Sequence, residues 1–234
     1  MTMLLAASAV FLGIHLLIAG TRARDTIVGT IGENAYLGLF SLASILAITW
    51  LVISYNIAQA SGADPTLYNL GPGVRHLGIP VVLIAFLIGV TGLFVPNPTS
   101  LKQEGAAAKP NAVQSVLAIT RHPFLWGVAI WAAFHTLANG DEASTIFFGT
   151  FLLLSLFGTV SIDAKRRRKM GAAWDAFAAK TSNIPFGAIL SGCASLARVI
   201  DWRMGLALAI FVVALFAHAR VIGVSPFPSG WAPF

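Results

Sequence analysis

Long uninterrupted apolar stretches are the feature that most limits how this chain of 234 residues can fold. The hydrocarbon core of a bilayer is about 30 Å thick, and a helix needs about 20 residues to cross it. Backbone polar groups inside hydrocarbon must be hydrogen-bonded within the protein, which favours helices. The candidate spans are residues 2–20, 35–56, 77–95, 123–139, 143–162 and 203–222. The sequence therefore predicts an all-α, polytopic integral membrane bundle of about six transmembrane helices.

The composition supports this class, because 57% of the residues are hydrophobic and only 10% are charged. Soluble domains carry about 25% charged residues. We find no convincing internal repeat, so residues 1–234 are expected to form a single transmembrane domain. The single cysteine, Cys193, excludes an internal disulfide and a thiolate metal cluster built from one chain.

The basic residues predict the orientation. Thirteen of the fifteen Lys and Arg residues fall in alternate loops, and only Arg75 and Arg220 fall on the opposite side. By the positive-inside rule the basic loops are cytoplasmic, which puts both termini on the far side and requires an even number of spans. The net charge of +6 then follows from topology and contact with anionic lipid. The expected partner is the lipid bilayer, and nucleic-acid binding is not expected.

Two histidines lie inside apolar stretches, His15 in the first and His135 in the fourth. Ionisable side chains within a membrane are costly and often functional, and imidazole is a common ligand for haem iron and similar metals. Arg22, seven residues after His15, lies on nearly the same helix face, where a haem propionate, an anionic lipid or an acidic substrate group could pair with it. The alternative for His15 is a hydrogen bond to a neighbouring helix.

The residues before His135 favour a flat ligand. Trp131, four residues earlier, offers a stacking wall, and Ala132 leaves space beside the imidazole. Alternatively, His135 and Asn139 mark the water-exposed end of a short helix. Residues 121–123, Arg-His-Pro, predict a helix start whose positive end could seat a carboxylate or phosphate, although any positive-inside boundary has the same composition.

Several short motifs together resemble the NnrU-like membrane proteins, a family that includes the plastid 15-cis-zeta-carotene isomerases. The resemblance covers nearly the whole chain and implies a polytopic protein of the bacterial inner membrane, so that both termini would be periplasmic. It also implies an association with nitrite and nitric oxide reduction in denitrifying bacteria. The motifs are Gly13-Ile14-His15 with Arg22, Asn34-Ala35-Tyr36, residues 119–123, Trp131 with His135-Thr136-Leu137, and Asp163-Ala164-Lys165.

The resemblance further implies a haem b cofactor, with His15 and His135 matching the positions of axial ligands. A cysteine that relatives carry three residues before the second histidine is Ala132 here, so an exchange of thiolate for imidazole on the iron is not expected. The expected function is haem-linked redox or isomerase-type chemistry with a hydrophobic small-molecule substrate or a membrane redox partner. Other residues expected near the cofactor are Arg22, Arg121, His122 and Trp131.

The spacing of the histidines from the basic residues predicts different depths. His15 lies seven residues from Arg22, about 10 Å along a helix, and His135 lies fourteen residues from Arg121, about 21 Å. The two imidazoles would then differ by about 10 Å along the bilayer normal unless the helices tilt.

Two other functional classes are open at this stage. The C-terminal half resembles the isoprenylcysteine carboxyl methyltransferases in its Arg-His-Pro segment, residues 162–166, residues 174–177 and Ile184-Pro185. In those enzymes a later acidic pair helps to form the S-adenosylmethionine pocket, and only Asp163 stands near that place here. The other class is a membrane subunit without chemistry of its own. The sequence decides neither whether the chain is an enzyme nor its oligomeric state.

Overall fold

The computed structural model describes residues 1–109 and 111–228, and this part of the chain is all-helical. Its only strand-like feature within those residues is an isolated bridge between Thr66 and Asp141. The all-α class predicted from the apolar stretches is therefore confirmed.

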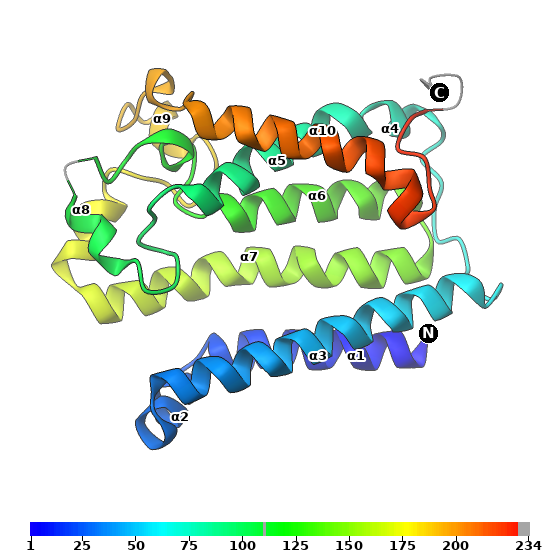
Figure 1. The fold of residues 1–234 in the computed structure, drawn as a ribbon, viewed down its shortest axis with the longest axis horizontal. Helices are drawn as coiled ribbons and strands as arrows, with labels where there is room; N and C mark the ends of the chain where they lie inside the picture. The colour runs from blue at the N-terminus through cyan, green and yellow to red at the C-terminus, as the bar shows by residue number, and fades with distance from the viewer. Residues whose placement is uncertain (110, 229–234) are drawn as a thin grey trace.

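The long helices form two groups that run roughly side by side (Figure 1). The first group is a hairpin, in which α1 continues into a π-helical segment, η1, and returns through α2 and α3. The second group contains α5, α6, α7 and α10. The bounds are α1 Thr2–Leu12, η1 Gly13–Ala19, α2 Ala23–Ile31, α3 Glu33–Ala60, α5 Gly78–Phe94, α6 Pro123–Asn139, α7 Glu142–Met170 and α10 Trp202–Ile222.

Short helices and turns connect these elements. They are α4 Gly73–His76, η2 Glu104–Ala108, η3 Ser115–Ala118, α8 Ala172–Ala178, α9 Gly187–Leu190 and η4 Leu196–Arg198. In Figure 1, α2, α8 and α9 lie at one end of the bundle, and the N-terminus and the last turn of α10 lie at the other. This placement agrees with an even number of crossings.

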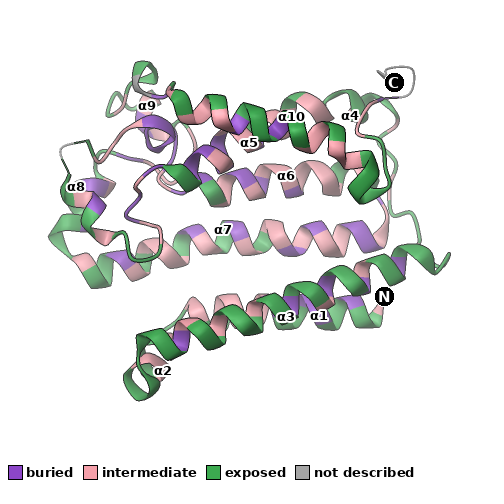
Figure 2. Ribbon diagram, in the orientation of Figure 1, coloured by how far each residue is buried: buried purple, intermediate pink, exposed green. Residues whose placement is uncertain are grey.

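Four helical segments are long and apolar enough to cross a membrane: Thr2–Ala19, α3, α7 and α10. The helices at the third and fourth predicted spans, α5 and α6, are shorter, with 17 residues each. The membrane class is thus supported, whereas the count of six spans stays a prediction. Figure 2 shows exposed residues along much of α3 and α10, and large apolar side chains such as Leu46 and Val213 are among them. Such apolar surface suits contact with lipid.

Two glycines bring α5 and α6 into backbone contact. A Cβ atom added to Gly127 would lie 2.5 Å from the Cα of Gly89 and 2.7 Å from the carbonyl oxygen of Ala85. Small residues allow this approach, which is a common way for helices to pack inside a membrane. The pair of glycines therefore sets the distance between α5 and α6.

We predict that Gly127→Ala destabilises the protein by about 1–3 kcal/mol, the usual cost of overpacking a tight contact. The matched control is Gly149→Ala in α7, where an added Cβ atom meets nothing within 4 Å. That control should be neutral or stabilising by up to about 1 kcal/mol, since alanine is the better helix former. Thermal unfolding in detergent measures both changes, and equal midpoints for the two variants would contradict the assigned contact.

Candidate functional site

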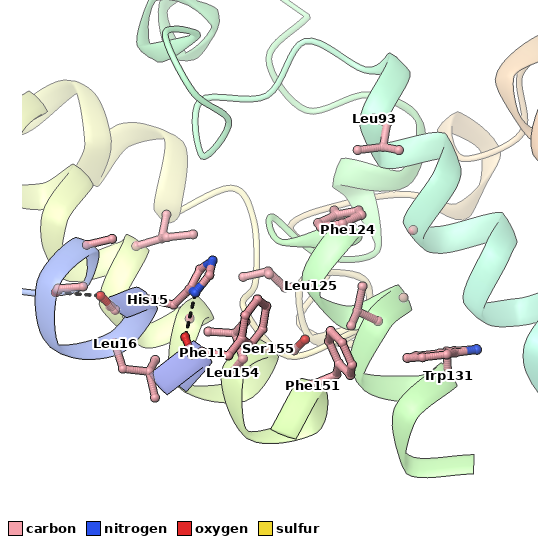
Figure 3. A pocket seen from close by; sticks show the side chains of 18 of the residues that line it. Phe11, His15, Leu16, Leu93, Phe124, Leu125, Trp131, Phe151, Leu154 and Ser155 are labelled. Carbon is pink, nitrogen blue, oxygen red and sulfur yellow. Dashed lines mark hydrogen bonds between the residues drawn. The ribbon is translucent and has the colours of Figure 1, made fainter. Parts of the chain in front are cut away.

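A cavity of about 700 Å³ lies between η1 and the helices α5, α6 and α7. Most of its lining is apolar. Figure 3 shows His15 and Trp131 toward opposite sides of this cavity, with Phe124, Leu125 and Phe151 between them. We call this space the central cavity.

The central cavity exists because of how the helices pack. The α1–α3 hairpin contacts the second helix group mainly through α7, which leaves room between the hairpin and helices α5 and α6. Four of the lining residues are glycines, and each allows a close approach of neighbouring protein atoms at the cavity wall. They are Gly20, Gly89, Gly127 and Gly158.

His15 projects into the central cavity from the π-helical segment. Its Nδ1 atom lies 2.8 Å from the carbonyl oxygen of Phe11 (Figure 3). A carbonyl oxygen can only accept, so Nδ1 carries a proton and donates it to Phe11. The ring packs against Phe11 and Phe40, at centroid distances of 4.4 Å and 5.2 Å. The hydrogen bond of Nδ1 thus leaves Nε2 as the ring nitrogen of His15 that another partner can use.

Lys165 and Ser161 of α7 close one end of the central cavity. The Nζ atom of Lys165 donates to the carbonyl oxygen of Ala19 at 2.6 Å, and the hydroxyl of Ser161 donates to that of Gly20 at 2.8 Å. These carbonyls lie where η1 ends and lack helical partners. Among the described residues that line the cavity, Lys165 is the one with a formal charge at neutral pH. Sequence analysis did not select it, because it is part of a longer basic run.

Arg121 and His122 contact a carboxylate of the chain itself. The Nε atom of Arg121 lies 3.0 Å from both carboxylate oxygens of Asp163, and a second guanidinium nitrogen also pairs with it. The Nε2 atom of His122 lies 2.6 Å from the same carboxylate. The three side chains are 15%, 1% and 19% exposed. The carboxylate that Arg121 and His122 contact at the start of α6 is thus that of Asp163, a residue of the chain itself.

Burial lowers the pKa of His122, and it does so although the hydrogen bond to Asp163 favours the charged form. The Nε2 atom donates to the carboxylate of Asp163, which can only accept. Its buried Nδ1 atom has no hydrogen-bond partner within the described part of the chain. This geometry indicates a structural contact between α6 and α7, and neither Arg121 nor His122 lines the central cavity. Their cofactor contact stays a prediction.

A second ion network lies next to this contact. Arg166 is buried, donates to the carbonyl oxygen of Ser100 at 2.6 Å and pairs with Glu104. Glu104 also accepts from Lys169 at 2.8 Å. Burial alone would raise the pKa of Glu104, but the hydrogen bond from Lys169 and the charge of Arg166 outweigh it and hold the pKa at about 2. The loop before α6 is thereby bound to the end of α7.

The structure places His135 away from the central cavity. His135 lines a second cavity of about 230 Å³, together with His218 of α10, whereas Trp131 lines both cavities. His15 and His135 thus lie in different cavities, in agreement with the different depths in the bilayer that the sequence predicts for them. Arg22 is exposed at the start of α2 and lines neither cavity. The described residues contain no group of three or more His, Cys, Asp or Glu side chains placed to hold a metal ion.

Comparison with known proteins identifies the relatives of this fold. The family model described as NnrU protein matches residues 3–226. The chloroplast 15-cis-zeta-carotene isomerases of Arabidopsis thaliana and Zea mays are 28% identical to the chain over 173 and 166 residues. The alignments cover 72% and 69% of this chain but 46% and 44% of those relatives, so the chain spans less than half of their length. No solved structure matches.

We predict that Asp163→Asn destabilises the protein by about 3 kcal/mol or more, because it leaves the charge of Arg121 buried without a counter-charge. The matched control is Asp175→Asn. Asp175 pairs with Arg167, and the two side chains are 61% and 67% exposed. Exposed pairs contribute less than about 1 kcal/mol, so the control should change little. Unfolding in detergent by heat or denaturant compares the two, and a small effect of Asp163→Asn would refute the buried contact.

Proposed function

Because the chain belongs to the NnrU family, we propose that its central cavity binds a long, apolar, conjugated molecule from the bilayer and changes its double-bond geometry. The observation that carries this proposal is a cavity of about 700 Å³ with an apolar lining and one imidazole, that of His15. The names of the two plant relatives, isomerases of a carotene, support the same substrate class.

The lining suits such a ligand. Small-molecule sites usually occupy about 300–1,000 Å³ and are mostly apolar with few polar groups. Aromatic rings provide flat walls for a conjugated chain. A net isomerisation breaks and forms no σ bond and consumes no reductant, so the chain's task is to orient the molecule and exclude water. The aromatic residues of the lining are Phe11, Phe40, Phe86, Phe124, Trp131 and Phe151.

The cavity also fits the haem b that the family resemblance implies. His15 would hold it, because its Nδ1–H is fixed on the Phe11 carbonyl and Nε2 is left for iron, a typical arrangement of metal-binding histidines. Lys165, at the end of the cavity, would pair with a propionate. When bound, haem supplies a Lewis-acid or electron-transfer centre. His135 opens on the other cavity, so the geometry favours His15 as the only imidazole facing the cofactor.

Location and biological role form part of the proposal. We place the protein in the bacterial inner membrane with the basic end, near α2, α8 and α9, in the cytoplasm and both termini in the periplasm. A role connected with denitrification rests on the family resemblance alone. Methyl transfer is not proposed, because Asp163 alone stands near the place where that resemblance requires an acidic pair. A membrane subunit without chemistry is the alternative if the cavity binds nothing.

The absorption spectrum of the protein purified in mild detergent from haem-replete cells, oxidised and then reduced with dithionite, tests the proposal. We expect one haem b per chain in the wild type. His15→Ala should lose the Soret band, whereas the matched variant His135→Ala should keep it, because only His15 lines the central cavity.

Loss of the band in both variants, with unchanged unfolding temperatures, would instead support the two-histidine ligation predicted from the sequence. A folded wild type that contains no haem would remove the cofactor from the proposal. If it also failed to retain a carotene from carotene-containing vesicles, the isomerase-type function would be contradicted and a non-catalytic subunit would remain.

A further inference from the structure

Large apolar side chains are exposed in the short segment between α8 and α10. We call residues 184–202 the linking segment; it contains α9, η4 and the first residue of α10. Leu190 and Ile200 are 85% and 84% exposed, more than any other large apolar side chain in the part of the chain that the structure describes. So much apolar surface in one segment is unfavourable in water. The other exposed apolar side chains are those of Ile184, Phe186, Leu196 and Trp202.

Neighbouring residues of the linking segment face the protein. Val199 is buried in a hydrophobic cluster that also contains Val116 and Leu117, and Ile189 packs against the same cluster. One face of the segment is therefore covered by the chain itself, and the exposed apolar side chains form the other face. Because the covered face already fixes the segment, folding does not explain the outer face.

The backbone of the linking segment is hydrogen-bonded to the residues before α6 and to itself. The amide of Phe186 donates to the carbonyl oxygen of Ile119 at 2.8 Å, and the amide of Ala194 donates to that of Ala188 at 3.0 Å. Backbone groups that enter a bilayer without such partners are costly. The segment is thus suited to the boundary between headgroups and hydrocarbon, whereas its helices of four and three residues are too short to cross a membrane.

The contacts of the linking segment place it where a short helix ends. Arg203, which directly follows the segment, donates from Nε to the carbonyl oxygen of Phe94, the last residue of α5, at 3.0 Å. Helices α5 and α6 have 17 residues each, which is about 26 Å of helix, whereas the hydrocarbon core is about 30 Å thick. In Figure 1, α9 lies beside the start of α10, at the same end of the bundle as α8. The segment therefore lies at the margin of the hydrocarbon core.

The charges and the tryptophan fit the same location. Residues 180–203 include three basic residues and one acidic residue, Asp201, which pairs with Arg203 at 2.8 Å. Lys180 is exposed. The Cζ atom of Arg203 lies over the ring of Trp202, 5.1 Å from its centroid, and tryptophan is enriched at membrane–water interfaces. Positive charge next to an apolar face is the combination that binds anionic lipid surfaces.

We propose that the linking segment lies in the interfacial region of the bilayer, on the basic side of the protein, and binds anionic phospholipid there. Leu190 and Ile200 insert among the acyl chains next to the headgroups, and Lys180 contacts lipid phosphate. The apolar surface continues into the exposed apolar side of α10, a helix long enough to cross the membrane. This location does not depend on what the central cavity binds, so it is tested independently of the proposed function.

An environment-sensitive fluorophore on a single cysteine measures the depth of the segment in the full chain. The background is Cys193→Ser, because Cys193 is the one cysteine of the sequence. In nanodiscs of phosphatidylcholine and phosphatidylglycerol, labels at Leu190→Cys and Ile200→Cys should emit at shorter wavelength and be quenched by lipid nitroxides near the headgroups. Both positions are exposed, so the label displaces no packed side chain. The matched control, Ala173→Cys in α8, is exposed and lies two residues before the exposed Asp175, so its label should be quenched by aqueous iodide instead.

Lipid composition and Lys180→Gln test the charge contact. Replacing phosphatidylglycerol by phosphatidylcholine should weaken the nitroxide quenching of the Ile200→Cys label, and Lys180→Gln should reduce this dependence on anionic lipid. Equal quenching in both lipids would contradict the contact with anionic phospholipid. Iodide quenching of the segment labels to the extent of the α8 control would overturn the proposal. Protection from both quenchers, with energy transfer between labels on two chains, would also overturn it, because a second copy of the chain would then cover this face.

Discussion

The carboxylate of Asp163 is the contact on which the arrangement of the helices depends. It accepts hydrogen bonds from Arg121 and His122 at the start of α6, and these bonds join that helix to α7. Its neighbours on α7 bind two other segments: Ser161 and Lys165 bind the end of η1, and Arg166 binds the loop before α6. Hydrogen bonds between oppositely charged groups are strong where water is scarce. Two turns of one helix thus join the two helix groups at the basic end.

The central cavity is a consequence of this connection. Both the hairpin and α6 are bound to α7, and direct packing does not close the space between η1 and α5. The imidazole of His15 and the ammonium of Lys165 are the groups in it that can act on a ligand. The same packing separates His15 from His135, with Trp131 lining both cavities, so one bundle presents two separate cavities.

The sequence predicted the local features of this architecture and missed the non-local ones. The length of the apolar stretches predicted the long helices, and the His122-Pro123 pair predicted the start of α6 at Pro123. The partner of Arg121 and His122 could not be predicted from spacing, because Asp163 is about forty residues away and pairs through helix packing. Lys165 was not singled out as a ligand-binding residue, because the basic run that contains it is explained by the positive-inside rule. The motif at residues 163–165 nevertheless includes it.

An electron cryomicroscopy map of the protein, purified with the ligand it retains from its own membrane, tests the central claim most directly. The account predicts density in the central cavity that reaches the Nε2 atom of His15 and lies against Phe151 and Trp131. A map in which apolar side chains fill that space, or in which density joins His15 to His135 as two ligands of one group, would contradict it.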